Sequence, residues 1–131
     1  MRVLVNNAAI VYGQPLLGGS ADGGVGGGAS VAQLQRSLDV NVAAHFWTVR
    51  AIVPQMLEGG RGTVVTLSSM MASLPAAGLA DYCAGKAAVS QLHACLRWEL
   101  LLALPLTRTL SRTLSLPLLL VLILILTLSL S

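Results

Sequence analysis

Apolar and polar positions follow two different periods along the chain, and together they predict a β-α-β-α order of elements. Short runs rich in β-branched residues predict strands at 2–6 and 63–68. Longer stretches with helical spacing predict helices at 31–58 and at about 80–103. This alternation is typical of an α/β fold whose parallel strands are joined by right-handed crossovers.

The first predicted helix, 31–58, carries signals for its start, its apolar face and its end. Ser30 is a predicted N-cap, because its hydroxyl can accept a hydrogen bond from the first turn. Pro54 should bend this helix or end it early, and Gly59 and Gly60 should supply the stop. Four side chains recur at every fourth position and form one apolar stripe: Leu34, Leu38, Val42 and Phe46.

The second predicted helix, about 80–103, contains both cysteines of the chain. We interpret Cys83 and Cys95 as reduced core thiols of an intracellular protein. Four side chains are expected to form the buried face of this helix: Ala88, Leu92, Leu96 and Leu100.

The two histidines and one tryptophan receive structural interpretations. His45 and His93 lie far apart in the sequence and have no carboxylates at ligand spacing, so we expect packing or solvent-facing roles and no metal site. Trp47 is expected to pack between helices.

A glycine-rich segment separates the first strand from the first helix. Residues 18–30 predict a flexible linker. Within it, Gly24-Val-Gly-Gly-Gly-Ala29 satisfies the G-x-G-x-x-A pattern of phosphate-binding turns. Because no strand precedes this string directly, we do not assign it to phosphate binding.

A hydrophobic, low-complexity tail, 105–131, follows a domain at 1–104. Residues 113–131 are 19 positions without a charge, close to the roughly 20 residues that a membrane-spanning helix needs. Two interpretations stay open: a membrane anchor, and a Leu/Ser/Thr-biased extension from an altered gene end.

Composition and charge exclude some classes of function. Of the 131 residues, 55% are hydrophobic and 10% are charged, whereas a soluble chain usually has about 25% charged residues. Eight basic against five acidic residues give a net charge of +3, but the bases are scattered, so nucleic-acid binding has no support. A cleavable signal peptide is not expected, because Asn6 and Asn7 interrupt the first apolar run.

Tyr82 and Lys86 carry the most chemical information in the chain. Four residues apart, they lie on one helical face, where the Lys86 ammonium would stabilise a Tyr82 phenolate. Such a pair is a proton donor suited to carbonyl reduction or alcohol oxidation. Ser69 follows the strand 63–68, at the strand end where open α/β sheets bind ligands. Its spacing of 13 residues from Tyr82 favours it over Ser68 for a catalytic role.

Taken together, these features resemble the short-chain dehydrogenases/reductases over roughly residues 2–102. The set occurs in family order: Asn6-Asn7-Ala8-Ala9, Asn41 in a helix, Ser68-Ser69 after a strand, and Tyr82-x-x-x-Lys86. A finer similarity is to the membrane-associated branch that acts on retinoids, steroids and other lipophilic carbonyls or alcohols. Three segments carry it: 45–48 (His-Phe-Trp-Thr), 54–58 (Pro-Gln-Met-Leu-Glu) and 81–83 (Asp-Tyr-Cys). The family usually has Gly at the position of Ala9 and Ser at that of Gly85.

The resemblance implies a partial Rossmann-like, doubly wound parallel sheet and an NAD(P)-dependent oxidoreductase. Such an enzyme interconverts an alcohol and a carbonyl on a small, possibly lipophilic, molecule. Tyr82 would be the general acid/base, and Ser69 would hydrogen-bond the substrate oxygen. Lys86 would support Tyr82 and grip the nicotinamide ribose, while Asn41 would anchor a water in the proton relay.

The same resemblance implies a cofactor contact and a subunit contact. Asn6, Asn7 and Ala8 would lie beside the adenosine part of NAD(P). A homodimer would form through the 31–58 and 80–103 helices. Membrane attachment through 113–131 does not come from the resemblance and is one of the two open interpretations of the uncharged tail.

One departure from the family pattern bears on activity. The first strand of the sequence corresponds to the fourth strand of the family, and a Gly-rich pyrophosphate turn is absent from the sequence. We therefore expect three strands and two helices to be missing. The alternatives to an active enzyme are a non-catalytic, membrane-tethered fragment and an incomplete gene model. The sequence decides neither the substrate nor the choice between NAD and NADP.

Overall fold

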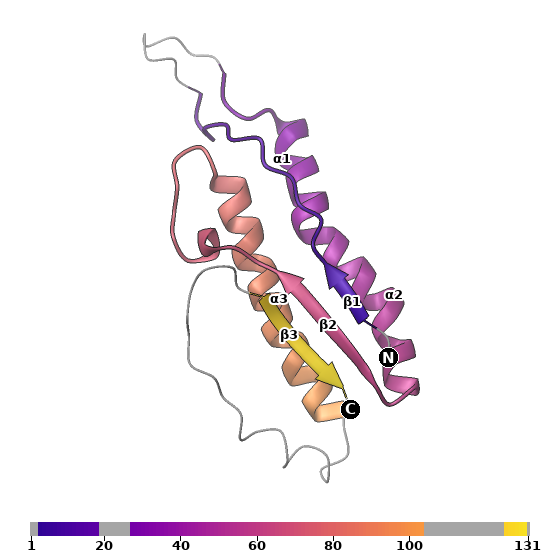
Figure 1. Ribbon diagram of the computed structural model, residues 1–131. Coiled ribbons are helices and arrows are strands. Elements are labelled where there is room, and N and C mark those ends of the chain that lie inside the picture. The colour runs from indigo at the N-terminus through magenta and orange to yellow at the C-terminus, as the bar shows by residue number, and fades with distance from the viewer. Residues whose placement is uncertain (1–2, 19–26, 104–124, 131) are drawn as a thin grey trace.

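A small sheet with helices on one face forms the part of the chain that the computed structural model describes, residues 3–18, 27–103 and 125–130 (Figure 1). The elements in chain order are β1 (Val3–Asn6), α1 (Val31–Leu38), η1 (Asp39–Ala43), α2 (Ala44–Glu58), β2 (Gly62–Leu67), η2 (Met70–Ala72), α3 (Ala80–Ala103) and β3 (Ile125–Leu130). Here η1 is a π-helix and η2 a 3₁₀-helix. The predicted α/β fold and its β-α-β-α order are confirmed.

The sheet has the order β1-β2-β3. β1 pairs with β2 in parallel, with Val3 opposite Thr63 and Asn6 opposite Thr66, so the predicted parallel pairing is confirmed. β3 pairs with β2 in the antiparallel sense, with Leu67 opposite Ile125. This third strand was not predicted, and it comes from the hydrophobic tail.

The rest of the tail lies outside the described residues, and so does the first half of the glycine-rich string, 24–26. At the base of the linker, the Ala29 amide donates to the Pro15 carbonyl at 2.9 Å. Among the residues that the structure describes, no helix has both the length and the apolar character that membrane spanning requires.

The long helical segment begins and ends on local signals. Ser30 forms a capping box with Gln33, as its hydroxyl accepts from the Gln33 amide at 3.2 Å and the Gln33 side chain accepts from the Ser30 amide at 2.9 Å. Gly60 adopts a φ of 63°, and its amide donates to the Leu57 carbonyl at 3.0 Å. The predicted cap and stop are confirmed. Pro54 does not end α2 early, because the helix continues to Glu58.

The apolar stripe is not the face that this helix buries. Leu38 and Phe46 are 44% and 45% exposed. The buried residues of the same segment include Ser37, Asn41 and His45, which also recur every fourth position. Among them, the Asn41 side chain bonds Ile10 on the loop after β1, as described below.

Several expectations about the burial of individual side chains are also wrong. Burial depends on which elements pack together, and spacing within one helix does not show this. On α3, Ala88 is exposed, and Val89 is fully buried in its place. Leu96 and Leu100 are buried as expected. Cys95 is exposed, and Trp47 does not pack between helices because it is 65% exposed.

The interior divides into an apolar and a polar part. Towards the amino ends of the strands, an apolar cluster joins α2, β2 and α3: Val53, Met56, Val64, Leu96 and Leu100. Towards the carboxyl ends, the buried side chains are polar: Asn6, Asn41, His45, Thr66, Ser68, Lys86 and His93. We call this second set the polar layer. It lies beneath the strand ends where the sequence predicts a site.

Candidate active site

Lys86 and Tyr82 lie together on the first half of α3. Lys86 is 2% exposed, and its Nζ donates to the Leu67 carbonyl at the end of β2, at 2.8 Å. The same Nζ lies 5.6 Å from the centroid of the Tyr82 ring. The backbone of β2 therefore fixes the lysine beside the half-buried tyrosine.

Burial lowers the pKa of Lys86 from its ordinary value. The charged amine is disfavoured because the protein replaces most of its water. The Leu67 carbonyl offsets part of this cost, since a hydrogen bond to a charged donor is stronger than a neutral one. The site thus holds a cation that loses its proton more readily than a lysine in water.

Two adjacent serines follow β2 and make different contacts. Ser68 is buried, lies 2.5 Å from the Ser90 hydroxyl and donates to the Lys86 carbonyl at 3.2 Å. It therefore ties the end of β2 to α3. Ser69 is half-buried and caps η2, where its Oγ accepts from the Met71 amide at 3.2 Å. The hydroxyl hydrogen of Ser69 stays available for another acceptor.

Asn41 lies at the centre of the π-helix η1 and holds the loop after β1. Its Oδ1 accepts from the Ile10 amide and its Nδ2 donates to the Ile10 carbonyl, both at 2.8 Å. Nδ2 also donates to Ser37 Oγ at 3.2 Å. Both amide hydrogens of the fully buried side chain are thus used within the protein. Single π turns inside α-helices occur often at functional sites.

The three residues expected to contact the cofactor lie at the carboxyl end of β1. Asn6 is buried, and its Oδ1 accepts from Thr48 on α2 at 2.8 Å, while its Nδ2 has no partner among the described residues. Asn7 and Ala8 are exposed. Asn6 therefore joins the strand to the helix, and the next two residues face outward at the strand end.

Both histidines are buried in the polar layer, so the solvent-facing alternative is wrong for them. His93 Nδ1 lies 3.0 Å from Thr66 Oγ1. The pKa of His93 is lowered, mainly by burial and to a lesser extent by the charge of Arg97. The pKa of His45 is also lowered, mainly by burial and to a lesser extent by the charge of Lys86. Its Nδ1 has no partner in the part of the chain that the structure describes. In the described residues, no cluster of potential metal ligands occurs.

Sequence reasoning gave His45 a packing role and did not single out Thr48. A signal for both was present, because Asn41, His45 and Thr48 follow helical spacing and form one polar face. From the sequence, we instead interpreted the apolar stripe as the defining face of this helix.

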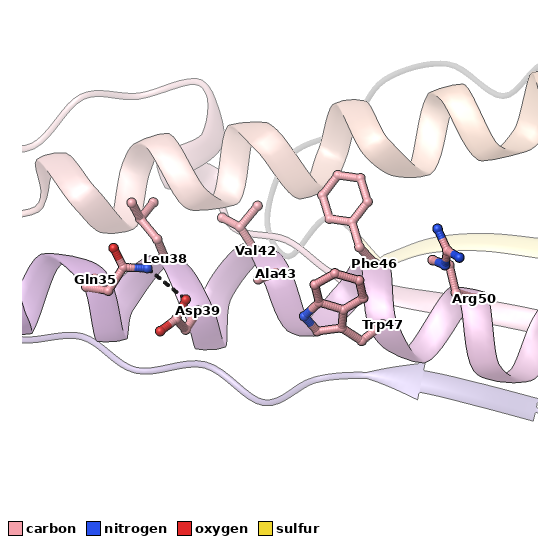
Figure 2. A pocket seen from close by; sticks show the side chains of 8 residues that line it. All are labelled: Gln35, Leu38, Asp39, Val42, Ala43, Phe46, Trp47 and Arg50. Atoms are coloured by element: carbon pink, nitrogen blue, oxygen red, sulfur yellow. Dashed lines mark hydrogen bonds between the residues drawn. The ribbon is translucent and has the colours of Figure 1, made fainter.

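That apolar stripe lines an open groove (Figure 2). The groove has a volume of about 540 Å³, and its lining residues are Gln35, Leu38, Asp39, Val42, Ala43, Phe46, Trp47 and Arg50. Leu38, Val42 and Phe46 project from one side of the helix, and Trp47 lies next to Phe46 (Figure 2). Gln35 donates to Asp39 at 2.9 Å along one edge.

Comparison with known proteins supports the resemblance seen in the sequence. The short chain dehydrogenase family matches residues 1–102. Retinol dehydrogenase 10 of Homo sapiens is 40% identical over 103 residues, which are 79% of this chain and 27% of that protein. Estradiol 17-beta-dehydrogenase 11 of Macaca fascicularis is 34% identical over 107 residues, 82% of this chain and 32% of that protein. The chain thus spans about a quarter to a third of the length of these relatives.

Solved structures give the same result for the fold. Serine dehydrogenase from Escherichia coli is similar with a TM-score of 0.64 and 31% identity, over 76% of this chain and 41% of that one. A closed form of serine dehydrogenase complexed with NADP+ has a TM-score of 0.62 and 32% identity, over 76% of this chain and 37% of that one. The partial Rossmann-like sheet expected from the sequence is therefore confirmed.

Proposed function

Because the chain belongs to the short-chain dehydrogenase family, we propose that it acts as an NAD(P)-dependent oxidoreductase that interconverts an alcohol and a carbonyl. One observation carries this proposal. The buried Lys86 ammonium is held by the Leu67 carbonyl at 2.8 Å and lies 5.6 Å from the Tyr82 ring centroid. This arrangement provides a cation beside the phenol that exchanges a proton with substrate.

Each side chain has a distinct task in this proposal. Tyr82 Oη gives a proton to the substrate oxygen in reduction and takes it back in oxidation. Ser69 donates a hydrogen bond to the same oxygen and holds it near Tyr82. Lys86 stabilises the phenolate that forms at Tyr82. Asn41 supports the site indirectly, because its two hydrogen bonds to the Ile10 backbone fix the loop that follows β1.

The residues present fit part of a nicotinamide cofactor. Lys86 suits the ribose next to the nicotinamide, and Asn6, Asn7 and Ala8 at the end of β1 suit the adenosine part. A bound nicotinamide would supply the hydride that the substrate carbon receives or loses. The usual pyrophosphate site is a Gly-rich turn that joins a strand directly to a helix N-terminus. β2 leads into η2 without such a turn, and the glycine-rich segment between β1 and α1 lies largely outside the described residues.

We propose a lipophilic alcohol or carbonyl as the substrate class. Two similar proteins support this proposal, because one is named a retinol dehydrogenase and the other an estradiol dehydrogenase. Both names denote largely apolar molecules with one reacting oxygen.

Replacement of Tyr82 tests the proposed chemistry. In a dehydrogenase-active form that carries these residues, Tyr82→Phe should lose turnover and keep its affinity for the cofactor, since Phe preserves the ring but has no transferable proton. Tyr12→Phe is the control, because Tyr12 lies on the loop after β1 and is 39% exposed. Equal turnover in wild type and Tyr82→Phe would remove Tyr82 from the mechanism.

A second candidate is a non-catalytic protein that keeps the family fold. Calorimetric titration of the 131-residue chain with NADH and NADPH separates the two candidates. Millimolar or weaker affinity supports the non-catalytic candidate, because several charge-assisted hydrogen bonds to the pyrophosphate would be absent. Micromolar affinity supports the enzyme.

The proposal extends to a homodimer through the 31–58 and 80–103 helices. Exposed aromatic side chains on both helices support it, since Trp47 is 65% and Trp98 68% exposed. Large apolar side chains that a monomer leaves exposed are typical of interaction surfaces.

Membrane association through 113–131 is also part of the proposal. Its support is the run of 19 residues without charge. Of this run the structure describes β3, which pairs with β2. A soluble reporter fused to residues 105–131 tests the idea, and an anchor predicts that the reporter resists carbonate extraction from membranes. A reporter that stays in the soluble fraction contradicts it.

A further inference from the structure

His45 occupies an unusual position for a side chain that makes no hydrogen bond through Nδ1. It is 3% exposed, and its Nδ1 is buried without a partner in the described part of the chain. A buried polar atom without a partner costs free energy, so a position of this kind calls for an explanation.

α3 packs closely against η1, the π-helix that ends two residues before His45. A Cβ atom at Gly85 would lie 3.2 Å from Asn41 Cβ, so the two backbones approach closely one residue before Lys86. Asn41 is one helical turn before His45. Lys86 is also the charged residue that acts on the His45 imidazole. The lysine and the histidine both belong to the polar layer.

Three side chains of the polar layer, Lys86, Asn6 and His45, have hydrogen-bonding capacity that the described residues do not use. The Lys86 ammonium has three hydrogens, and the described residues supply it with one acceptor, the Leu67 carbonyl. Asn6 Nδ2 is a buried donor without a partner. Thr48 links Asn6 to the turn of His45, because its hydroxyl lies 2.8 Å from Asn6 Oδ1 and 3.1 Å from the His45 carbonyl. Two donors and one acceptor are the partners that a single buried water uses.

We propose that His45 is a positioning residue for Lys86 and acts through one buried water. The water accepts hydrogen bonds from Lys86 Nζ and Asn6 Nδ2, and it donates one to the Nδ1 of neutral His45. This contact gives the ammonium a second fixed acceptor and keeps it beside Tyr82. The inference rests on the proposed function, because it assigns His45 a task in the same site.

The surrounding charges are compatible with a neutral His45. β1 and β2 carry no ionisable side chains. On α3, Lys86 faces His45 and opposes a positive charge on the imidazole. In this environment the imidazole keeps a free acceptor nitrogen, provided that its proton is on Nε2.

The tautomer of His45 in the wild-type protein is the first test. Nitrogen-15 spectra of the labelled 131-residue chain report which ring nitrogen carries the proton. We expect the Nε2–H tautomer at neutral pH. The Nδ1–H tautomer overturns the proposal without the need for any variant, because Nδ1 would then be a donor.

Variants at His45 and His93 give the second test. His45→Leu removes the acceptor, whereas His45→Asn places an amide oxygen near the position of Nδ1. We expect NMR titration to show that the pKa of Lys86 falls in His45→Leu and returns to the wild-type value in His45→Asn. His93→Leu is the matched control, because His93 is 4% exposed but lies next to Thr66 and Arg97. Equal effects of His45→Leu and His93→Leu on the Lys86 titration overturn the proposal.

A kinetic measurement separates this inference from the proposed function. In a dehydrogenase-active form, His45→Leu should lower kcat about tenfold, the effect of one hydrogen bond to a charged group, with KM unchanged. The pH profile of kcat should also shift in His45→Leu. His45→Asn should restore both kcat and its pH profile to the wild-type values. A wild type without turnover contradicts the proposed function, while the tautomer and the Lys86 titration still decide the role of His45.

Discussion

Asn41 and Ile10 exchange two hydrogen bonds across 31 positions of sequence. The Ile10 amide donates to Asn41 Oδ1 and Asn41 Nδ2 donates to the Ile10 carbonyl, each at 2.8 Å. One side chain thus satisfies both backbone groups of a residue in the loop after β1. The loop and the π-helix are fixed together, and the position of Asn7 and Ala8 depends on this contact.

Loss of the Asn41 side chain should destabilise the protein. Asn41→Ala removes both bonds and leaves a cavity at a fully buried position, so we expect a loss of about 2–3 kcal/mol in the free energy of unfolding. Urea denaturation followed by circular dichroism measures it. Asn7→Ala is the control, because Asn7 is exposed and a surface change usually stays within about 0.5 kcal/mol. Similar losses in both variants would show that the Ile10 contact contributes little.

Stability should fall as the pH decreases below about 6.5, the ordinary pKa of histidine. The folded-state pKa values of His45 and His93 are lowered, mainly by burial. Between the folded and the unfolded pKa, the unfolded chain binds more protons than the folded protein. Acid therefore favours unfolding, with a slope that approaches about 1.4 kcal/mol per pH unit for each histidine. Above pH 6.5 this contribution to stability is fully present.

Urea denaturation between pH 5 and 7.5 measures this slope. The double variant His45→Asn/His93→Asn should have a flatter profile over the same range, since asparagine does not titrate. An equally steep profile in the double variant would assign the acid sensitivity to other groups.

Gly62 should not tolerate a side chain. A Cβ atom there would lie 2.5 Å from Met56 Sδ, and Met56 is fully buried in the apolar cluster. Gly62→Ala should therefore cost about 1–3 kcal/mol of folding free energy through overpacking. In the double variant Gly62→Ala/Met56→Ala the added methyl group enters space that Met56 leaves, so the combined loss should be smaller than the sum. Additive losses would exclude direct contact as the cause.

Association through the helical groove predicts sensitivity to charge at Trp47. Trp47→Glu should shift sedimentation of the protein from dimer to monomer at micromolar concentration, because a carboxylate at the centre of an apolar contact loses its water. Leu16→Glu is the control, since Leu16 is 54% exposed but lies on the loop after β1. A wild type that sediments as a monomer contradicts the dimer.

Local signals made much of the fold predictable. The cap at Ser30, the stop at Gly60 and the two parallel strands depend on neighbours in sequence. The Tyr82–Lys86 pair was visible for the same reason, since four residues are one helical turn. The π turn at Asp39–Ala43 left no signal that we recognised.

Features that depend on distant contacts were not predictable. Spacing cannot tell which of two stripes on one helix is buried. The polar residue Asn41 is buried against Ile10, which lies 31 positions away in the sequence. The bond from Lys86 to the Leu67 carbonyl joins two elements, as does the bond from Ser68 to α3. The β3 strand was missed because a run of leucines fits a membrane helix and a sheet edge equally well.

The division of the interior into an apolar cluster and a polar layer has a consequence for protein engineering. Met56, Val64 and Leu100 lie in the apolar cluster, away from the residues that meet at the strand ends. Combinatorial libraries directed at this cluster can therefore raise thermal tolerance without altering the residues that we propose to contact substrate. Libraries directed at the polar layer change both properties at once, so selection for activity and selection for heat resistance are best applied to separate sets of codons.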